Sequence, residues 1–275
     1  LVIHILSGVS GLTLCILLGK RSGYGRTAML PHNLPMTVLG ASILWFGWFG
    51  FNAGSALGAN ALAASAFVVS QAAAAAATVS WVLMEWKFNG KPTVLGAVSG
   101  CIAGLVAITP AAGFVEPLPA IIIGLIGGGI CYFAVAVLKD KLGYDDSLDA
   151  FGIHGIGGTW GSLATGLWAT TGVNPAGANG LFYGETDLFV AQVISTVVAY
   201  ALAIVGTFIL FKIVSAICDV RADESEELAG LDIVEHGERG YGRSVVGGTI
   251  MGSFEDSSEM LANTVMKVNA KGGTV

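Results

Sequence analysis

Residues 151–160 read FGIHGIGGTW, and residues 1–12 read LVIHILSGVSGL. Each stretch places one histidine inside an apolar, glycine-rich segment. In both stretches the histidine is followed by glycines in the spacing H-x3-G-x2-G. The two sets are His4, Gly8 and Gly11, and His154, Gly158 and Gly161. The repeated spacing predicts two equivalent helices that each bring an ionisable ring into nonpolar surroundings.

The composition indicates that lipid surrounds most of the chain. Of 275 residues, 54% are hydrophobic and only 12% are charged, and the mean hydropathy is +0.74. Soluble domains carry about 25% charged residues. The 40 glycines fit close helix packing in a membrane, because small residues let helix backbones approach. The net charge of −6 argues against a nucleic-acid partner.

Apolar runs of spanning length divide the chain. A membrane-spanning helix needs about 20 residues, with a range of about 17–25. The runs cover residues 1–19, 36–57, 61–83, 93–109, 118–138, 150–170 and 188–211. A soluble all-α core would require polar faces on its outer helices, and the run 61–83 has none. We therefore predict an all-α, polytopic membrane protein whose transmembrane domain occupies residues 1–211.

Basic residues alternate between the connections of these seven runs. The first, third and fifth connections contain Lys or Arg, whereas the second, fourth and sixth contain neither. Short cytoplasmic loops carry an excess of Lys and Arg. We therefore predict a multi-pass protein of the cell membrane with its odd connections and its C-terminus in the cytoplasm.

The composition changes after the last apolar run. Residues 212–242 are acidic and polar, and we predict an ordered cytoplasmic region there. Residues 243–275 are rich in Gly and Ser with little pattern, and we predict a flexible tail. The chain opens inside an apolar run, from which we expect a further N-terminal part in the natural protein.

His4 and His154 have two possible explanations. Ionisable groups inside a membrane are costly, so each imidazole needs hydrogen-bond partners. The pair could form a structural hydrogen bond between helices, or it could line a polar pathway. Equivalent positions of two structural repeats meet near the bilayer midplane, which favours the pathway. Two neutral imidazoles can share a proton, and we expect their ring nitrogens within about 2.6–3.2 Å.

A second informative stretch is ILWFGWFGFNAGS, residues 43–55. Four of its residues recur on one helix face, and Asn52 lies beside them. They are Leu44, Trp48, Phe51 and Ser55. Such a stripe can be lipid-facing or core packing, or its rings can stabilise a small cation that loses water. Asp149, which precedes the His154 segment, is interpreted first as a helix N-cap or a favourable anion at the helix start, and second as a group that polarises the inner end of a pathway.

Several longer motifs resemble the ammonium transporter (Amt/Mep/Rh) family, on the Amt side. They are VIHILSGVSGL, LPHNLP, LWFGWFGFNAGS, ITPAAGFV, SLDAFGIHGIGGTWGSLATGLW and GLDIVEHGERGYG, and they extend from residue 1 to about residue 242. The resemblance implies an eleven-helix homotrimer with one pore in each subunit and two inverted five-helix repeats. Residues 1–19 would then be most of the fifth helix, and the rest would supply helices six to eleven.

The resemblance also implies roles for single residues. His4 and His154 match the twin histidines of the pore, Phe51 the inner ring of a phenylalanine gate, and Ser55 the hydroxyl of an ammonium recruitment site. Leu44, Trp48 and Ala150 match pore-lining positions, and Asp149 matches an aspartate below the second histidine.

The expected function is therefore conduction of ammonium into the cytoplasm, without a cofactor or metal, under control of a PII-type signalling protein at the tail. The alternative is an ammonium sensor with the same pore fold. An enzyme is not expected, because no Ser/His or paired-Asp catalytic set is visible.

Overall fold

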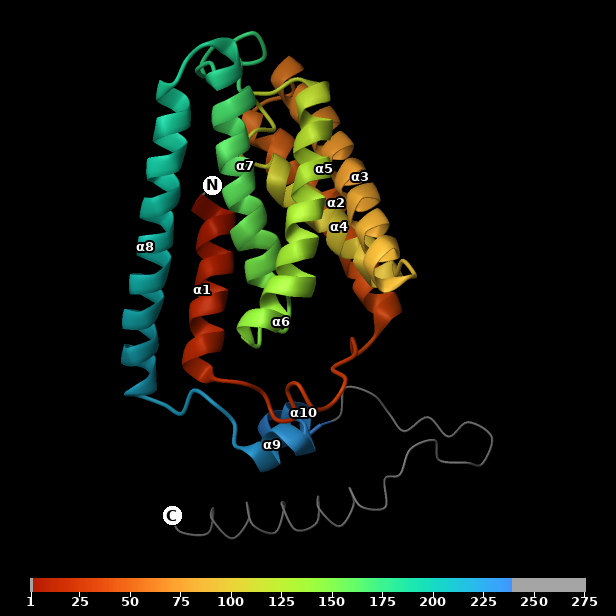
Figure 1. Ribbon diagram of the computed structural model, residues 1–275. Coiled ribbons are helices and arrows are strands. Elements are labelled where there is room, and N and C mark those ends of the chain that lie inside the picture. Colours follow the sequence, from red (N-terminus) through yellow and green to blue (C-terminus); the bar gives the residue numbers. More distant parts are fainter. Residues whose placement is uncertain (1, 239–275) are drawn as a thin grey trace. The chain divides into compact units, whose positions relative to one another are not determined.

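The computed structural model describes residues 2–238, and every regular element within that range is a helix (Figure 1). A helix occupies each of the seven predicted apolar runs. The main helices are α1 (Val2–Leu18), α2 (Leu34–Ala53), α3 (Ala61–Asn89), α4 (Val94–Ile108), α5 (Pro117–Phe133), α7 (Ile156–Trp168) and α8 (Asp187–Ser215). Shorter elements are the 3₁₀ turns η1 (Gly54–Ala56) and η4 (Leu181–Tyr183), the π-helical turns η2 (Ala134–Leu138) and η3 (Phe151–Gly155), and the helices α6 (Lys139–Leu142), α9 (Glu224–Ala229) and α10 (Leu231–His236).

Four continuous helical stretches are long and apolar enough to cross a membrane. They are Leu34–Ala56, Ala61–Asn89, Pro117–Leu142 and Asp187–Ser215. Two other apolar helices are shorter, α1 with 17 residues and α4 with 15. The run 93–109 therefore yields less helix than expected from the sequence. Its length is limited because the Thr93 side chain caps the first turn and Pro110 follows the C-cap residue Thr109 at the other end.

The helix boundaries follow from turn chemistry in the sequence. The side chains of Asn33, Asn60 and Thr93 each accept a hydrogen bond from a backbone N–H in the first turn of α2, α3 and α4. At the other end of α3, Gly90 has a φ of +78°, a left-handed conformation that glycine adopts without strain. These caps place the polar loops at the helix ends.

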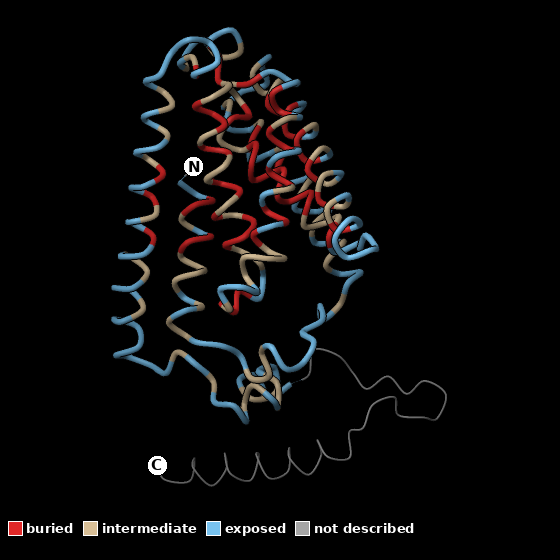
Figure 2. Tube along the Cα trace, viewed as in Figure 1, coloured by how far each residue is buried: buried red, intermediate tan, exposed pale blue. Residues whose placement is uncertain are grey.

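The core of the helical bundle consists of α3, α4, α5 and α7, and small residues set its spacing. An ideal Cβ on Gly104 of α4 would lie 2.5 Å from the Ala73 carbonyl oxygen of α3. One on Gly124 of α5 would lie 2.3 Å from the same oxygen. In Figure 2 the buried positions gather on these inner helices, whereas α8 is largely exposed. Such close backbone contact is the packing that small residues permit between membrane helices.

Hydrogen bonds between side chains attach α8 to the bundle along one face. The Ser162 hydroxyl donates to the Gln192 side chain at 2.7 Å, and the Thr207 hydroxyl donates to Ser10 at 2.8 Å. Many large nonpolar side chains of α8, such as Val197 and Leu210, are exposed. This pattern of one polar seam and otherwise apolar faces fits a helix at the lipid boundary.

Within the described residues, a second compact unit contains residues 21–28 together with residues 214–238. Within it, the Glu227 carboxylate accepts a hydrogen bond from the Ser22 backbone N–H at 2.8 Å and pairs with Arg221 at 2.9 Å. The Ser22 hydrogen bond, with help from Arg221, lowers the pKa of Glu227. The predicted region 212–242 thus begins in the last turn of α8, which ends at Ser215. It also includes α9 and α10. The predicted flexible tail, 243–275, lies outside the described residues.

Candidate functional site

The two motif histidines lie side by side in the bundle. His4 belongs to α1 and His154 to the π-helical turn η3 that precedes α7. Their Nδ1 atoms are 3.2 Å apart, and their ring centroids are 5.3 Å apart. The prediction of a direct contact between the two rings is therefore confirmed. A hydrogen bond between the two Nδ1 atoms needs one hydrogen, so one of them donates and the other accepts.

Glycines allow the two histidine helices to cross at this point. An ideal Cβ on Gly8 would lie 2.1 Å from the backbone nitrogen of Gly155, and one on Gly158 would lie 2.9 Å from the His4 Cβ. Side chains at these positions would force the helices apart. The first glycine of each motif thus sets the distance between the rings.

Two aromatic side chains of α2 surround His4. The Trp48 indole stacks on the His4 ring with a centroid distance of 5.3 Å and an interplanar angle of 7°. Phe51 meets the His4 ring edge-on at 6.0 Å and the Trp48 ring edge-on at 5.8 Å. The helix face predicted from the sequence therefore meets His4 at these two positions. Leu44, one turn earlier, is 47% exposed, and the described contacts do not join it to either histidine.

Polar contacts hold α2 against its neighbours. Trp48 Nε1 donates to the Thr109 hydroxyl at 2.9 Å, and Asn52 Nδ2 donates to the Ser70 hydroxyl at 2.9 Å. Asn52 is buried, so its amide tethers α2 to α3. Ser55, in η1, is exposed, and its hydroxyl donates to the Phe51 carbonyl oxygen at 2.6 Å.

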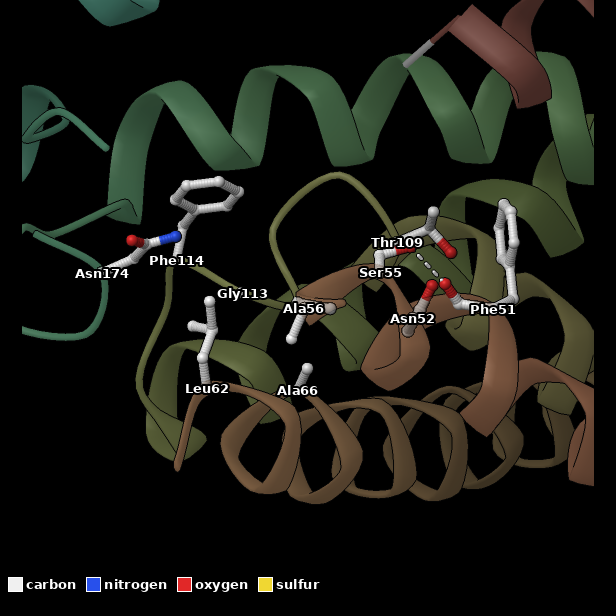
Figure 3. Close-up of a pocket in the computed structure, with 11 residues that line it drawn as sticks. Phe51, Asn52, Ser55, Ala56, Leu62, Ala66, Thr109, Gly113, Phe114 and Asn174 are labelled. Atoms are coloured by element: carbon white, nitrogen blue, oxygen red, sulfur yellow. Dashed lines mark hydrogen bonds between the residues drawn. The ribbon is translucent and has the colours of Figure 1, made fainter. Parts of the chain in front are cut away.

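A pocket of about 170 Å³ opens beside Phe51, which forms with Trp48 the aromatic wall next to His4 (Figure 3). Phe51, Asn52, Ser55 and Thr109 lie at one end of the view, and Phe114 and Asn174 lie at the other. The lining combines an exposed phenyl ring with hydroxyl and amide groups. Rings and oxygen acceptors of this kind can replace part of the water shell of a small cation.

Two aspartates that directly precede the His154 segment have different roles. The Asp146 carboxylate accepts hydrogen bonds from the backbone N–H groups of Ala150, at 3.1 Å, and Phe151, at 2.7 Å. Asp149 instead pairs with Lys139 through its carboxylate. The N-cap interpretation of Asp149 is therefore wrong, because Asp146 performs the capping.

The backbone conformation of Asp149 explains why Asp146, and not Asp149, caps the segment. Asp149 has a φ of +55°, a left-handed conformation that Asp tolerates better than most residues. Burial raises the pKa of the Asp149 carboxyl, while the hydrogen bond and charge of Lys139 oppose the rise. Ala150 follows Asp149 and packs on α1, where a Cβ on Gly11 would lie 3.5 Å from the Ala150 Cβ.

The site contains two residues that the sequence patterns did not reveal. Thr109 accepts a hydrogen bond from Trp48, which stacks on His4. Asp146 accepts a hydrogen bond from the backbone of η3, which carries His154. Asp146 carried a signal that could have found it, because the run DDSLD directly precedes the apolar segment. Thr109 stands before a proline at a helix end and shows no pattern of its own.

Comparison with known proteins gives a consistent result. The sequence model of the Ammonium Transporter Family matches residues 1–241. An ammonium transporter of Bacillus subtilis (strain 168) is 58% identical over 240 residues, which cover 87% of this chain and 59% of that protein. A putative ammonium transporter of Methanothermobacter thermautotrophicus is 48% identical over 242 residues, or 88% of this chain and 59% of that protein.

Solved structures agree with the sequence comparison. The crystal structure of Saccharomyces cerevisiae Mep2 matches with a TM-score of 0.73 at 38% identity, over 78% of this chain and 51% of that chain. A structure described as a sensor Amt protein matches with a TM-score of 0.76 at 28% identity, over 85% of this chain and 58% of that chain. The chain thus spans a little over half the length of these relatives. The predicted all-α membrane fold is confirmed, and the match over residues 1–241 shows that this chain belongs to the ammonium transporter family.

Proposed function

We propose that the natural protein conducts ammonium into the cytoplasm through a pore in which His4 and His154 form a proton-sharing pair. Family membership supports the substrate. The observation that carries the mechanism is the Nδ1–Nδ1 distance of 3.2 Å within an apolar helix bundle. The role is transport and not enzymatic catalysis.

The histidine pair offers the polar contact that a small protonatable solute needs away from water. Because the two Nδ1 atoms bind each other, the Nε2 atoms remain for a solute. His4 Nε2 is buried and has no hydrogen-bond partner among the described residues. A buried nitrogen without a partner is costly, so a solute that supplies one is stabilised there. Two imidazolium ions would repel each other, which favours the neutral pair.

The pocket and the aromatic wall are proposed as the entrance to this pathway. The Ser55 hydroxyl and the Phe51 ring line the pocket and recruit the ammonium cation, with Asn52 fixed beside them. Trp48 covers His4. Leu44 and Ala150 are proposed to line the pore further along, and Asp149 to act at its inner end through the pair with Lys139. The cation loses its proton as it leaves the pocket, and ammonia and the proton pass the histidines separately.

Orientation, assembly and regulation complete the proposal. The distribution of Lys and Arg supports a cytoplasmic C-terminus, and we propose that transport is directed inward. We propose a homotrimer with one pore in each subunit, embedded in the lipid bilayer. The acidic region that contains α9 and α10 is proposed as the regulatory contact for a PII-type signalling protein.

The test is an ammonium current measurement on the natural, full-length protein in membranes. His4→Ala and His154→Ala should each lose or alter ammonium conduction while the protein still assembles. His32→Ala is the matched control, because His32 lies in the exposed loop before α2. Parental currents in both pore variants would contradict the mechanism.

An ammonium sensor remains the second candidate, because a structure described as a sensor Amt protein matches over 85% of the chain. A sensor would bind ammonium and change the state of its cytoplasmic region without net flux. Measured ammonium flux in reconstituted vesicles favours transport. Ammonium-dependent signalling with no flux would favour the sensor.

A further inference from the structure

We propose that Thr109 is a positioning residue that sets the plane of the Trp48 indole against His4 and thereby fixes the geometry of the histidine pair. The proposal rests on the proposed function for its consequence on conduction, but its structural part can be tested independently. Thr109 is the residue that follows α4, so it lies on a different element from the rings that it orients.

The contacts form one continuous chain from the end of α4 through α2 and α1 to η3. The Thr109 hydroxyl accepts a hydrogen bond from Trp48 Nε1 at 2.9 Å. The Trp48 ring then stacks on His4 at 5.3 Å with an interplanar angle of 7°. His4 Nδ1 lies 3.2 Å from His154 Nδ1. A change in the indole plane is therefore transmitted directly to the ring that contacts His154.

The hydroxyl of Thr109 is itself fixed in direction. It donates its single hydrogen to the Leu105 carbonyl oxygen at 2.7 Å. With the hydrogen used there, the oxygen can only accept, which is what a donor-only indole N–H requires. The direction of the Trp48 hydrogen bond is therefore determined by the backbone of α4.

The Thr109 hydroxyl is the one hydrogen-bond partner of the Trp48 N–H group among the described residues. Trp48 is 5% exposed and belongs to a buried cluster that contains nonpolar side chains such as Cys101 and Ile102. Nonpolar contacts fill space without preferring one direction of the N–H group. If the hydroxyl is removed, the N–H group is buried without a partner and the ring turns to find one, because an unsatisfied buried donor is costly.

Phe51 indicates why the plane of the indole matters. It meets both Trp48 and His4 edge-on, at 89° and 84°. Because the Trp48 and His4 rings are parallel to within 7°, the single Phe51 ring meets both of them edge-on, and a turned indole would disturb its edge contact with Phe51 and its stacking on His4 together. Thr109 also lines the pocket, so the same hydroxyl connects the pocket wall to the histidine pair.

The experiment compares Thr109→Val with Thr109→Ser in the natural, full-length protein. Valine keeps the shape and removes the hydroxyl, whereas serine keeps the hydroxyl. We expect Thr109→Val to lower the ammonium current about tenfold at equal protein level, which corresponds to the loss of one hydrogen bond, and Thr109→Ser to restore it to within about twofold. In a Trp48→Phe background, Thr109→Val should have no further effect, because its partner is already absent.

A second readout does not depend on transport. Structures of the two variants by electron cryo-microscopy should show parallel Trp48 and His4 rings in Thr109→Ser and inclined rings in Thr109→Val. Parallel rings in Thr109→Val would overturn the proposal, as would a Thr109→Val current effect that persists fully in the Trp48→Phe background. If the parent conducts no ammonium, the proposed function fails, and the ring planes still decide the role of Thr109.

Discussion

The two H-x3-G-x2-G segments have the same spacing but different backbones. His4 lies in a regular α-helix, whereas His154 lies in the π-helical turn η3. The first glycine of each motif serves the crossing of the two segments. The second glycines differ: a Cβ on Gly11 would be in ordinary contact at 3.5 Å, whereas one on Gly161 would lie 2.3 Å from the Ala107 carbonyl oxygen of α4. The first glycine of each motif therefore allows the two histidine segments to cross. The second glycine of each motif is adapted to different neighbouring residues.

The π-helical turn is supported by side chains that have no equivalent role on α1 among the described residues. Asp146 binds two backbone N–H groups at the start of the turn, and Asp149 adopts a left-handed conformation and pairs with Lys139. Short π-helical turns occur often at functional sites, where they redirect a side chain. We interpret η3 as the feature that turns His154 Nδ1 toward His4.

The largest expected effect is that of Gly8→Ala. The added Cβ would lie 2.1 Å from Gly155 N and 2.9 Å from the Ala150 carbonyl oxygen, and both atoms belong to backbone that cannot rotate away. We expect a loss of about 3 kcal/mol or more in the free energy of unfolding, at the upper end of overpacking effects. The melting temperature of the detergent-purified protein measures it. A parental melting temperature would show that the crossing is looser than the structure indicates.

Asp146→Ala comes next in size. It removes the acceptor of two N–H groups at the start of the His154 segment, and we expect a cost of about 2 kcal/mol, since single caps contribute about 0.5–2 kcal/mol. The ammonium current should also fall, because the π-helical turn then loses its anchor. The matched control is Asp140→Ala, an exposed acidic residue in α6. Equal effects of the two substitutions would argue against a specific role of Asp146.

Much of the fold and part of the site could be predicted from the sequence. The apolar runs and their turn residues predicted the positions of all seven main helices, because hydrophobic length and cap chemistry act locally. The pairing of His4 with His154 followed from a repeated spacing. Thr109 was missed because its role depends on a contact with Trp48 that local patterns do not encode. Asp146 was missed although the acidic run before the apolar segment carried a signal, because that run does not show which of its aspartates binds the backbone of η3. Asp149 was assigned a cap because its left-handed backbone cannot be read from its neighbours.

Asp149→Asn should have a smaller effect that depends on pH. Burial raises the pKa of the Asp149 carboxyl in the folded state, against the opposing influence of Lys139. A carboxyl with a raised pKa contributes stability that is fully present below its unfolded pKa of about 3.9 and is lost as the pH rises through the folded value. The parent should therefore lose stability as the pH rises above about 4, and the variant should show a flatter profile.

The magnitude of that pH effect should stay below about 1 kcal/mol, because the Lys139–Asp149 pair is 21% and 27% exposed and water screens it. Melting temperatures of the parent and Asp149→Asn, measured in parallel across this pH range, give the comparison. Parallel profiles would show that Asp149 is not the group whose titration matters at this end of the segment.

The smallest effect is expected for Gly11→Ala, and it provides the sharpest comparison of the two motifs. The added Cβ would meet the Ala150 Cβ at 3.5 Å, an ordinary van der Waals distance. Alanine is favoured over glycine in a helix interior by about 0.5–1 kcal/mol, so the melting temperature should stay the same or rise slightly. Gly161→Ala is the matched variant, and it should destabilise the protein because its Cβ would lie 2.3 Å from a carbonyl oxygen. If Gly11→Ala is as destabilising as Gly161→Ala, the second glycines serve one common purpose, and the two histidine segments are more alike than their backbones indicate.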